Sequence, residues 1–392
     1  MIHIDLETRN LLELGGKNTS GLDNYARHSS ARVLMCAWAY DDEPVRLWFP
    51  EDPMPDKLKK GIEGNEKIAA WATAFERNIF QRVLNITIPI SRWSDPQASA
   101  RYLSLPADLG ACGDVLELPS SFRKDARGEA LIELFSEPKF PRKKKGQEPG
   151  EPYFNTAETH PDEWDEFCEY CKRDVIAERE IARRLNILGV YPLPEREQQI
   201  WYLDQKINDR GVPVDVEFAK KMYAIALRSK AEAVAEQRRI TGLDKPNGPK
   251  LLPWVRERGF PGNSLRKEAV VAALKNPEVK LTDECREVLK NRRIAASTSY
   301  TKLAAILRCV SSDGRLRNQF IYMGSARCGR WSGNAVQLHN FARPDKEFED
   351  KAVIDEARTM INRNDYGGIV KKFGQPLRVV KNLLRTVFVA AS

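Results

Sequence analysis

The N-terminal stretch His3-Ile4-Asp5-Leu6-Glu7 alternates polar and apolar side chains within a run of β-prone residues. Because successive side chains of a strand point to opposite faces, Asp5 and Glu7 are expected to project to the same side. Two carboxylates at this spacing repel each other unless protons or cations screen them. A strand face with two solvated acids would also explain the pair, so the choice depends on whether further acids join it.

The chain has 392 residues, which predicts two or three domains, and its 42% hydrophobic and 30% charged residues are typical of a globular protein. No apolar run approaches the about 18 residues of a membrane helix, and the N-terminus lacks a basic-then-apolar signal peptide. We therefore expect a cytoplasmic protein with no membrane partner. The seven cysteines are odd in number and scattered, which argues against a disulfide framework. Cys168 and Cys171 form a lone C-x-x-C, expected to be ordinary reduced thiols.

Charge is distributed unevenly along the chain. Residues 1–190 contain 26 Lys and Arg against 32 Asp and Glu, a balance of −6, whereas residues 191–392 contain 37 against 23, a balance of +14. Between Arg286 and Arg343 there are 11 basic residues and two acids, Glu287 and Asp313. A solvated surface accounts for part of this excess, but its local density favours a polyanionic partner such as nucleic acid.

Residues 1–190 alternate strand and helix patterns, which predicts a mixed α/β domain ending near residue 190. Strands are expected at 2–6, 32–40, 45–49 and 67–71, and helices at 74–84, 126–135 and 162–188, with a basic loop at 138–161.

The remaining sequence is mostly helical up to residue 312 and then changes character. Helices are expected at 196–209, 216–241, 250–259, 265–274 and 282–307, with Asp215, Ser264 and Thr282 as N-caps. From residue 313 glycines and short strands precede helices at 346–362 and within 365–390. The chain ends in an apolar run, LLRTVFVAAS, which must be buried against something and so favours a partner that completes the fold.

Further acids follow in the first domain. Glu76 is expected in the first turn of a helix that follows a strand, and Asp174 lies four residues after Tyr170, so both side chains share one helix face. With Asp5 and Glu7, these carboxylates could hold two divalent cations about 3.5–4 Å apart, which activate water and stabilise charge on a phosphoryl group. The phenol of Tyr170 could orient the attacking water.

The order D-x-E, F-E after a strand, and Y-x-x-x-D on a helix resembles the three motifs of the DEDD 3′–5′ exonucleases in their tyrosine variant. The segment PADLGACGDVLELPSSFRKDARGEALIELFSEPKF also resembles the exonuclease domains of phage family A DNA polymerases. This resemblance implies an RNase H-like fold, two Mg²⁺ or Mn²⁺ ions as cofactors, and stepwise release of nucleoside monophosphates from the 3′ end of single-stranded DNA. It further implies a phage protein in a bacterial host.

The resemblance has departures in the second motif. Ala72 stands where the family usually has Asn, and loss of that amide could weaken the activity. The acid of this motif, Glu76, is Asp in most of the family. Asp95 and Asp165 are nearby acids that could assist, but both are expected to be ordinary surface residues.

The segment GSARCGRWSGNAVQLHNFARP resembles the family signature G-A-x-R-T-G-R-x-S-G…Q-L-Q-N-L-P-R-P, which holds the primer–template duplex. The resemblance implies minor-groove or sugar contacts by Arg330 and Asn340, with support from Arg327, Gln337 and Arg343. Such contacts check duplex shape without reading sequence. Here Cys328, His339 and Ala342 replace Thr, Gln and Pro, which leaves the role of His339 open. WYLDQKINDRGVPVD and the segment 293–303 resemble the family's thumb-side region.

In the family, the first catalytic Asp of the polymerase follows a segment like KNLLRTVFVAAS, where this sequence stops. We therefore expect the N-terminal part of a family A DNA polymerase, with an exonuclease domain at 1–190, a helical linker and thumb region at 191–312, and an incomplete α+β palm at 313–392. Polymerisation would need palm and fingers, from a second polypeptide or from a longer chain. The alternatives are a non-catalytic DNA-binding or scaffold subunit with a decayed nuclease site, and a free-standing exonuclease with a DNA-clamping extension.

Overall fold

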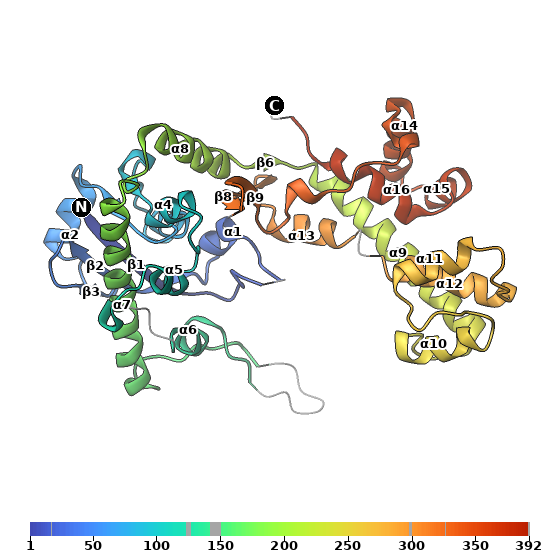
Figure 1. Ribbon diagram of the computed structural model, residues 1–392, viewed down its shortest axis with the longest axis horizontal. Helices are drawn as coiled ribbons and strands as arrows, with labels where there is room; N and C mark the ends of the chain where they lie inside the picture. The colour runs from blue at the N-terminus through green and yellow to red at the C-terminus, as the bar shows by residue number, and fades with distance from the viewer. Residues whose placement is uncertain (17, 123–126, 142–149, 298–299, 326, 391–392) are drawn as a thin grey trace. The chain divides into compact units, whose positions relative to one another are not determined.

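The structure, a computed structural model, describes residues 1–16, 18–122, 127–141, 150–297, 300–325 and 327–390. These residues form two units, one of Met1–Val212 with Arg308–Asn340 and the other of Pro213–Leu307 with Phe341–Ser392. Strands and helices mix in the first unit, whereas helices dominate the second (Figure 1). The mixed α/β character expected from the sequence is confirmed. The predicted limits of functional regions at residues 190 and 312 stay predictions.

A five-stranded sheet with the order β3-β2-β1-β4-β5 organises the first unit. Strands β1, β2 and β3 are antiparallel neighbours, and β4 and β5 continue the sheet in parallel from β1. The strands are β1 (Ile2–Arg9), β2 (Arg32–Tyr40), β3 (Arg46–Trp48), β4 (Ile68–Ala69) and β5 (Trp93–Ser94). The four expected strands are thus confirmed with shifted ends, while β5, at two residues, was too short to show alternation in the sequence.

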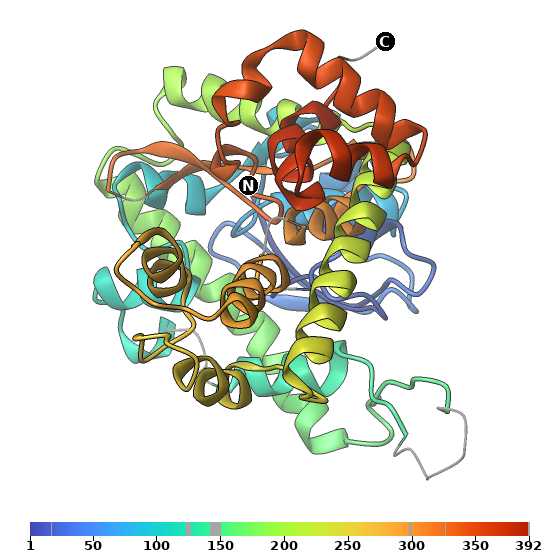
Figure 2. The same cartoon turned by 90° about the vertical axis from the view of Figure 1, so that its right-hand side faces the viewer.

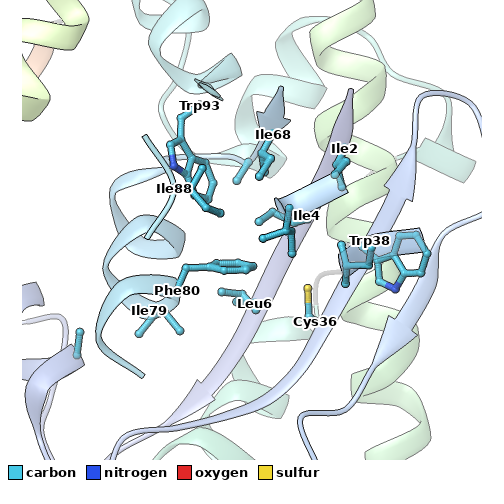
Figure 3. Close-up of a cluster of buried hydrophobic side chains, with 14 of the residues drawn as sticks. Ile2, Ile4, Leu6, Cys36, Trp38, Ile68, Ile79, Phe80, Ile88 and Trp93 are labelled. Atoms are coloured by element: carbon cyan, nitrogen blue, oxygen red, sulfur yellow. The ribbon is translucent and has the colours of Figure 1, made fainter. Parts of the chain in front are cut away.

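The alternation in β1 divides its side chains between two layers of helices. Ile2, Ile4 and Leu6 lie on the side of the sheet that packs against Phe80, together with Trp93 (Figure 3). Burial of each such side chain contributes roughly 1.5–3 kcal/mol. Helices α2 (Asp56–Glu63), α3 (Ala74–Arg82) and α8 (Glu195–Arg210) supply buried residues to this layer.

The opposite face of the sheet is covered by the long helix α7 (Pro161–Ile187) and by α6 (Gly128–Ser136). Apolar residues of β2, such as Met35 and Ala37, pack there against Phe167 and Val175 of α7. The polar side chains of β1 therefore face α7 and are surrounded by apolar residues. Helix α7 matches its expected range within one residue at each end, and the start expected for α6 at Ala126 lies outside the described residues.

Shorter elements complete the first unit, and most of them carried no clear periodicity in the sequence. They are α1 (Leu22–Arg27), η1 (Ile90–Arg92), α4 (Pro96–Tyr102), α5 (Leu109–Val115), η2 (Ser120–Phe122), β7 (Arg315–Leu316), β8 (Phe320–Ser325), β9 (Arg330–Gly333) and η3 (Leu338–Asn340). The expected loop at 138–161 contains an isolated bridge between Lys139 and Tyr153, and its residues 142–149 lie outside the described ranges.

Helix α9 (Val216–Thr241) is the central helix of the second unit, and α12 (Asp283–Ala295) runs beside it (Figures 1 and 2). The predicted N-caps Asp215 and Thr282 are confirmed, because their side chains accept hydrogen bonds from the backbone N–H groups three residues on. Ser264 is wrong as a cap, since the next helix begins after Arg266. The remaining elements are α10 (Gly248–Arg256), α11 (Lys267–Lys275), η4 (Lys346–Glu349), α14 (Lys351–Asn362), α15 (Tyr366–Phe373), α16 (Pro376–Leu383) and η5 (Leu384–Val387).

Two expected helices are divided. The helix predicted at 282–307 ends at Ala295 as α12, and α13 (Thr301–Cys309) follows. The backbone N–H of Ser297 closes a turn on the carbonyl of Ile294 at 3.1 Å instead of continuing the helix. The helix predicted at 346–362 is interrupted at Asp350, which caps α14 by accepting from the N–H of Ala352.

Leu383, Leu384 and Val387 of the apolar C-terminal run are buried within their own unit, whereas Val389 and Ala390 are exposed. Leu383 and Val387 have no exposed surface, and the carbonyl of Val387 accepts a hydrogen bond from the N–H of Asp215 at 2.8 Å. Phe388 bridges to Val214. Part of this run is therefore buried without a partner, and the partner itself stays a prediction. Across the described ranges, no helix combines the length and apolarity needed to cross a membrane.

Candidate metal centre and nucleic-acid interface

A polar stripe runs between β1 and α7. The strand contributes His3, Asp5 and Glu7 at every second residue, and the helix contributes side chains from three successive turns. At one point Cys171 donates its S–H to Asp5 Oδ2, with 3.5 Å between sulfur and oxygen. At another, His3 Nδ1 lies 2.8 Å from Glu178 Oε2. The stripe thus joins strand and helix across the covered face of the sheet.

The centre of the stripe gathers possible metal ligands. One oxygen each of Asp5 and Glu7 and the sulfur of Cys171 all lie within 4.8 Å of one another. Asp5 is partly exposed, whereas Glu7 and Cys171 are buried. Burial, together with the charges of Asp5 and Glu7, raises the pKa of the Cys171 thiol well above its ordinary value. In this arrangement the thiol keeps its proton.

Tyr170 and Asp174 lie on the same face of α7, next to these carboxylates. Burial raises the pKa of Tyr170, and the charges of Asp174, Glu7 and Asp5 and a hydrogen bond to Asp174 raise it further. The phenol therefore stays protonated at neutral pH. Gly128 leaves the space that the ring occupies, because a Cβ at this glycine would stand 2.0 Å from the ring of Tyr170.

Glu76 completes the set from the first turn of α3. Its side chain is 3% exposed, and its Oε2 has no hydrogen-bond partner among the described residues. Burial first, and then the charge of Asp5, raises the pKa of Glu76 well above its ordinary value. A buried carboxylate oxygen in this state needs a proton or a cation. The donor set therefore fits divalent cations.

Asp95 supports the turn that precedes Glu76. Its side chain accepts hydrogen bonds from the N–H of Ala72 and the hydroxyl of Thr73, both at 3.2 Å, and it caps α4. Burial outweighs these bonds and raises the pKa of Asp95 to about 6. The interpretation of Asp95 as an ordinary surface acid is therefore wrong, whereas Asp165 is exposed as expected.

The structure thus brings Asp5, Glu7, Glu76, Tyr170 and Asp174 to one place, together with residues that the sequence did not identify. Cys171 lies among the carboxylates, although the sequence predicted only a reduced thiol. His3 and Glu178 form a buried pair at one end of the stripe. The spacing of His3 from Asp5, and of Glu178 from Asp174, was the available signal, because each repeats the period of its element.

Four of the five proposed DNA contacts lie on and beside the β8–β9 hairpin. Arg327 lies in its turn and Arg330 begins β9, whereas Gln337 precedes η3 and Asn340 ends it. These four residues are in the first unit and Arg343 is in the second. All five side chains are exposed. Asn340 Nδ2 donates to Gln337 Oε1 at 3.2 Å. The side chains are therefore accessible to a polyanion.

Cys328 and His339, which differ from the signature given above, each contact a neighbouring side chain. Arg330 Nε donates to Cys328 Sγ at 3.1 Å. Hydrogen bonds from Ser325 and Arg330 lower the pKa of the exposed Cys328 thiol to about 7. The ring of His339 lies 5.7 Å from that of Phe320, so this side chain packs against the hairpin.

Comparisons with known proteins point to polymerases. No family model matches the chain. It is 32% identical over 392 residues to a DNA polymerase of Bacillus phage SP02, a match that covers 99% of this chain and 57% of that protein. The chain thus spans little more than half the length of this relative.

A solved structure has a similar fold. It is the POL domain of Pol1 from M. smegmatis in complex with DNA primer-template and dNTP, with a TM-score of 0.51 and 14% identity. The match covers 90% of this chain and 53% of that chain. At this identity the likeness shows the fold alone.

Proposed function

We propose that the chain is the N-terminal part of a family A DNA polymerase that acts in phage DNA replication and carries a 3′–5′ proofreading exonuclease. The observation that carries this proposal is the convergence of Asp5, Glu7, Glu76 and Asp174 from three separate segments. The sheet order β3-β2-β1-β4-β5, with three antiparallel strands followed by two parallel ones, supports an RNase H-like exonuclease domain.

The four carboxylates would hold two Mg²⁺ or Mn²⁺ ions against the phosphodiester at the 3′ end of single-stranded DNA. When bound, such ions lower the pKa of a water and stabilise charge on the phosphoryl oxygens. Tyr170 keeps its phenolic proton and can orient the attacking water through its oxygen. The burial of Glu7 and Glu76 limits the access of bulk water and strengthens their interaction with cations.

The basic hairpin would hold primer–template duplex. Arg330 and Asn340 are proposed to contact the minor groove or sugars, supported by Arg327, Gln337 and Arg343. Their exposure and the similarity to a DNA polymerase support this assignment. Polymerisation is proposed only for the chain together with palm and fingers, from further sequence or a second polypeptide, since the relative is longer than the match.

The test is release of mononucleotides from 3′-labelled single-stranded DNA in Mg²⁺ or Mn²⁺. Combined Asp5→Ala and Asp174→Ala substitution is expected to reduce the rate by about a thousandfold, since several kcal/mol of transition-state stabilisation is lost. Asp165→Asn replaces an exposed acid on α7, the helix that carries Asp174, and should leave the rate unchanged. Absence of release by the unsubstituted chain, or release indifferent to the double substitution, would refute the nuclease.

Ala72 favours a second candidate function, that of a DNA-binding scaffold whose nuclease site has lost its activity. This residue lacks the amide that the exonuclease family usually has there. A scaffold would bind DNA with a steep dependence on salt. It would release no nucleotide with either cation, which distinguishes it from a slow nuclease.

A further inference from the structure

We propose that Cys171 is a ligand of the cation held by Asp5 and Glu7, so that this centre takes a thiophilic divalent cation such as Co²⁺, Zn²⁺ or Cd²⁺. The inference rests on the proposed metal site and deepens it, because it assigns a sulfur ligand to a centre otherwise built from oxygen. An all-oxygen site favours Mg²⁺ and Mn²⁺, whereas a thiolate ligand shifts the preference toward softer ions.

The geometry places the sulfur within reach of such a cation. Cys171 Sγ lies 3.5 Å from Asp5 Oδ2 and 3.9 Å from the backbone oxygen of Asp5. The three ligand atoms of Asp5, Glu7 and Cys171 are within 4.8 Å of one another. Atoms that bind one cation at about 2.0–2.3 Å can be at most about 4.6 Å apart. Small side-chain rotations therefore bring all three into one coordination shell.

Glu76 provides an independent sign of a ligand at this place. Its Oε2 is buried and has no hydrogen-bond partner among the described residues, and the charge of Asp5 acts on it. Such an oxygen is satisfied by a cation between it and Asp5. It would supply a fourth donor, so that the centre combines one sulfur with oxygens.

Binding changes the bonding of Cys171 in a simple way. Without a cation, its S–H donates to Asp5. On binding, the S–H bond breaks, a sulfur–metal bond forms, and the proton passes to water.

Cys168, one turn earlier on α7, is only partly buried and lies near Asp165, Glu169 and Lys172. It is therefore a matched control on the same helix.

The test is titration of the full chain with Co²⁺ under reducing, oxygen-free conditions, followed by absorption spectroscopy. We expect a sulfur-to-cobalt charge-transfer band in the unsubstituted chain and in Cys168→Ser, and its loss in Cys171→Ser and Cys171→Ala. Affinity for Co²⁺ and Cd²⁺ should fall by about tenfold or more in both variants, since one metal–ligand bond is lost. Mn²⁺ affinity of Cys171→Ser, measured by electron paramagnetic resonance, should change less than the Cd²⁺ affinity.

Two outcomes would overturn the inference, and they differ in what they say of the proposed function. If Co²⁺ binds in a manner that Asp5→Ala weakens, but without a sulfur band or with one that persists in Cys171→Ser, Cys171 is no ligand and the oxygen site stands. If neither Mn²⁺ nor Co²⁺ binds to the unsubstituted chain, both the inference and the proposed metal site fail. Circular dichroism of each variant checks that the fold is retained.

Discussion

Ala72 has a backbone φ of +65°, in the left-handed region that alanine adopts at a cost of about 1 kcal/mol and that asparagine tolerates better. Its N–H donates to Asp95, and its position immediately precedes the turn that places Glu76. This residue therefore combines backbone strain with the absence of an amide beside the proposed site.

Ala72→Asn is expected to raise the free energy of unfolding by about 0.5–1 kcal/mol and to increase the rate of nucleotide release severalfold. Ala72→Gly is the matched control, because it relieves the strain without supplying an amide, while the added freedom of the unfolded chain offsets its gain in stability. Urea unfolding and the labelled-DNA assay measure the two effects. Equal acceleration by Gly and Asn would contradict a role for the amide.

The sequence was informative at those residues whose spacing carries a signal. Asp5 with Glu7, and Tyr170 with Asp174, each repeat the period of one element, so their shared faces could be predicted. His3 and Glu178 are 175 positions apart, and their pairing depends on how β1 packs under α7. Asp95 was misjudged for the same reason, since it accepts a hydrogen bond from Ala72, which lies 23 positions away in the sequence.

At the scale of elements, α8 is joined to the β8–β9 hairpin through a buried acid. Asp204 of α8 is 2% exposed and accepts hydrogen bonds from Gln205 at 3.0 Å and Asn208 at 3.2 Å. Asn208 also bonds the backbone N–H and carbonyl of Phe320 in β8. Trp331 of β9 lies close enough to Asp204 to lower the pKa of this acid. The acid therefore contributes to the placement of the hairpin that carries the proposed DNA contacts.

Burial raises the pKa of Asp204 to about 7, above its ordinary value of about 3.9. Between about pH 4 and 7 the folded unit thus holds a proton that the unfolded chain has released. The stabilisation that the protonated acid provides is complete below about pH 4, and it is lost as pH rises through 7. Asp204→Asn mimics the protonated acid, so it should raise stability less at pH 5 than at pH 8, with a difference on the order of 1–3 kcal/mol between the two. Urea unfolding at both values measures this, with exposed Asp165→Asn as control. An equal effect at both pH values would contradict it.

Elements whose ends are set by local sequence could be predicted more closely than elements that depend on tertiary contacts. Helix α9 was predicted at its observed ends because Asp215 caps its start and Gly242, with a φ of +67°, ends it. Strands β4 and β5 contain two residues each, and they exist through pairing with neighbours. Their length and register depend on tertiary packing, which local periodicity does not encode.

At the scale of the whole molecule, the charge asymmetry places the excess of positive charge in the half of the sequence that contains the hairpin. Residues 191–392 carry 37 basic against 23 acidic residues. Contacts of exposed arginines with phosphates release condensed counterions, so duplex binding should weaken steeply as salt increases.

Combined Arg327→Ala and Arg330→Ala substitution is expected to weaken duplex binding and to lower the slope of log K against log[salt] by about 1, because the phosphate contact proposed for Arg327 accounts for about 0.9, whereas Arg330 is proposed to contact the minor groove or sugars. The loss should be similar for duplexes of different sequence, since minor-groove acceptors are nearly the same for every base pair. Arg183→Ala is the control, because Asp42 and Glu180 already neutralise that guanidinium. Fluorescence anisotropy with labelled duplexes at several salt concentrations measures both quantities. An unchanged slope would exclude a phosphate contact by Arg327, and a loss confined to one sequence would indicate direct base reading instead.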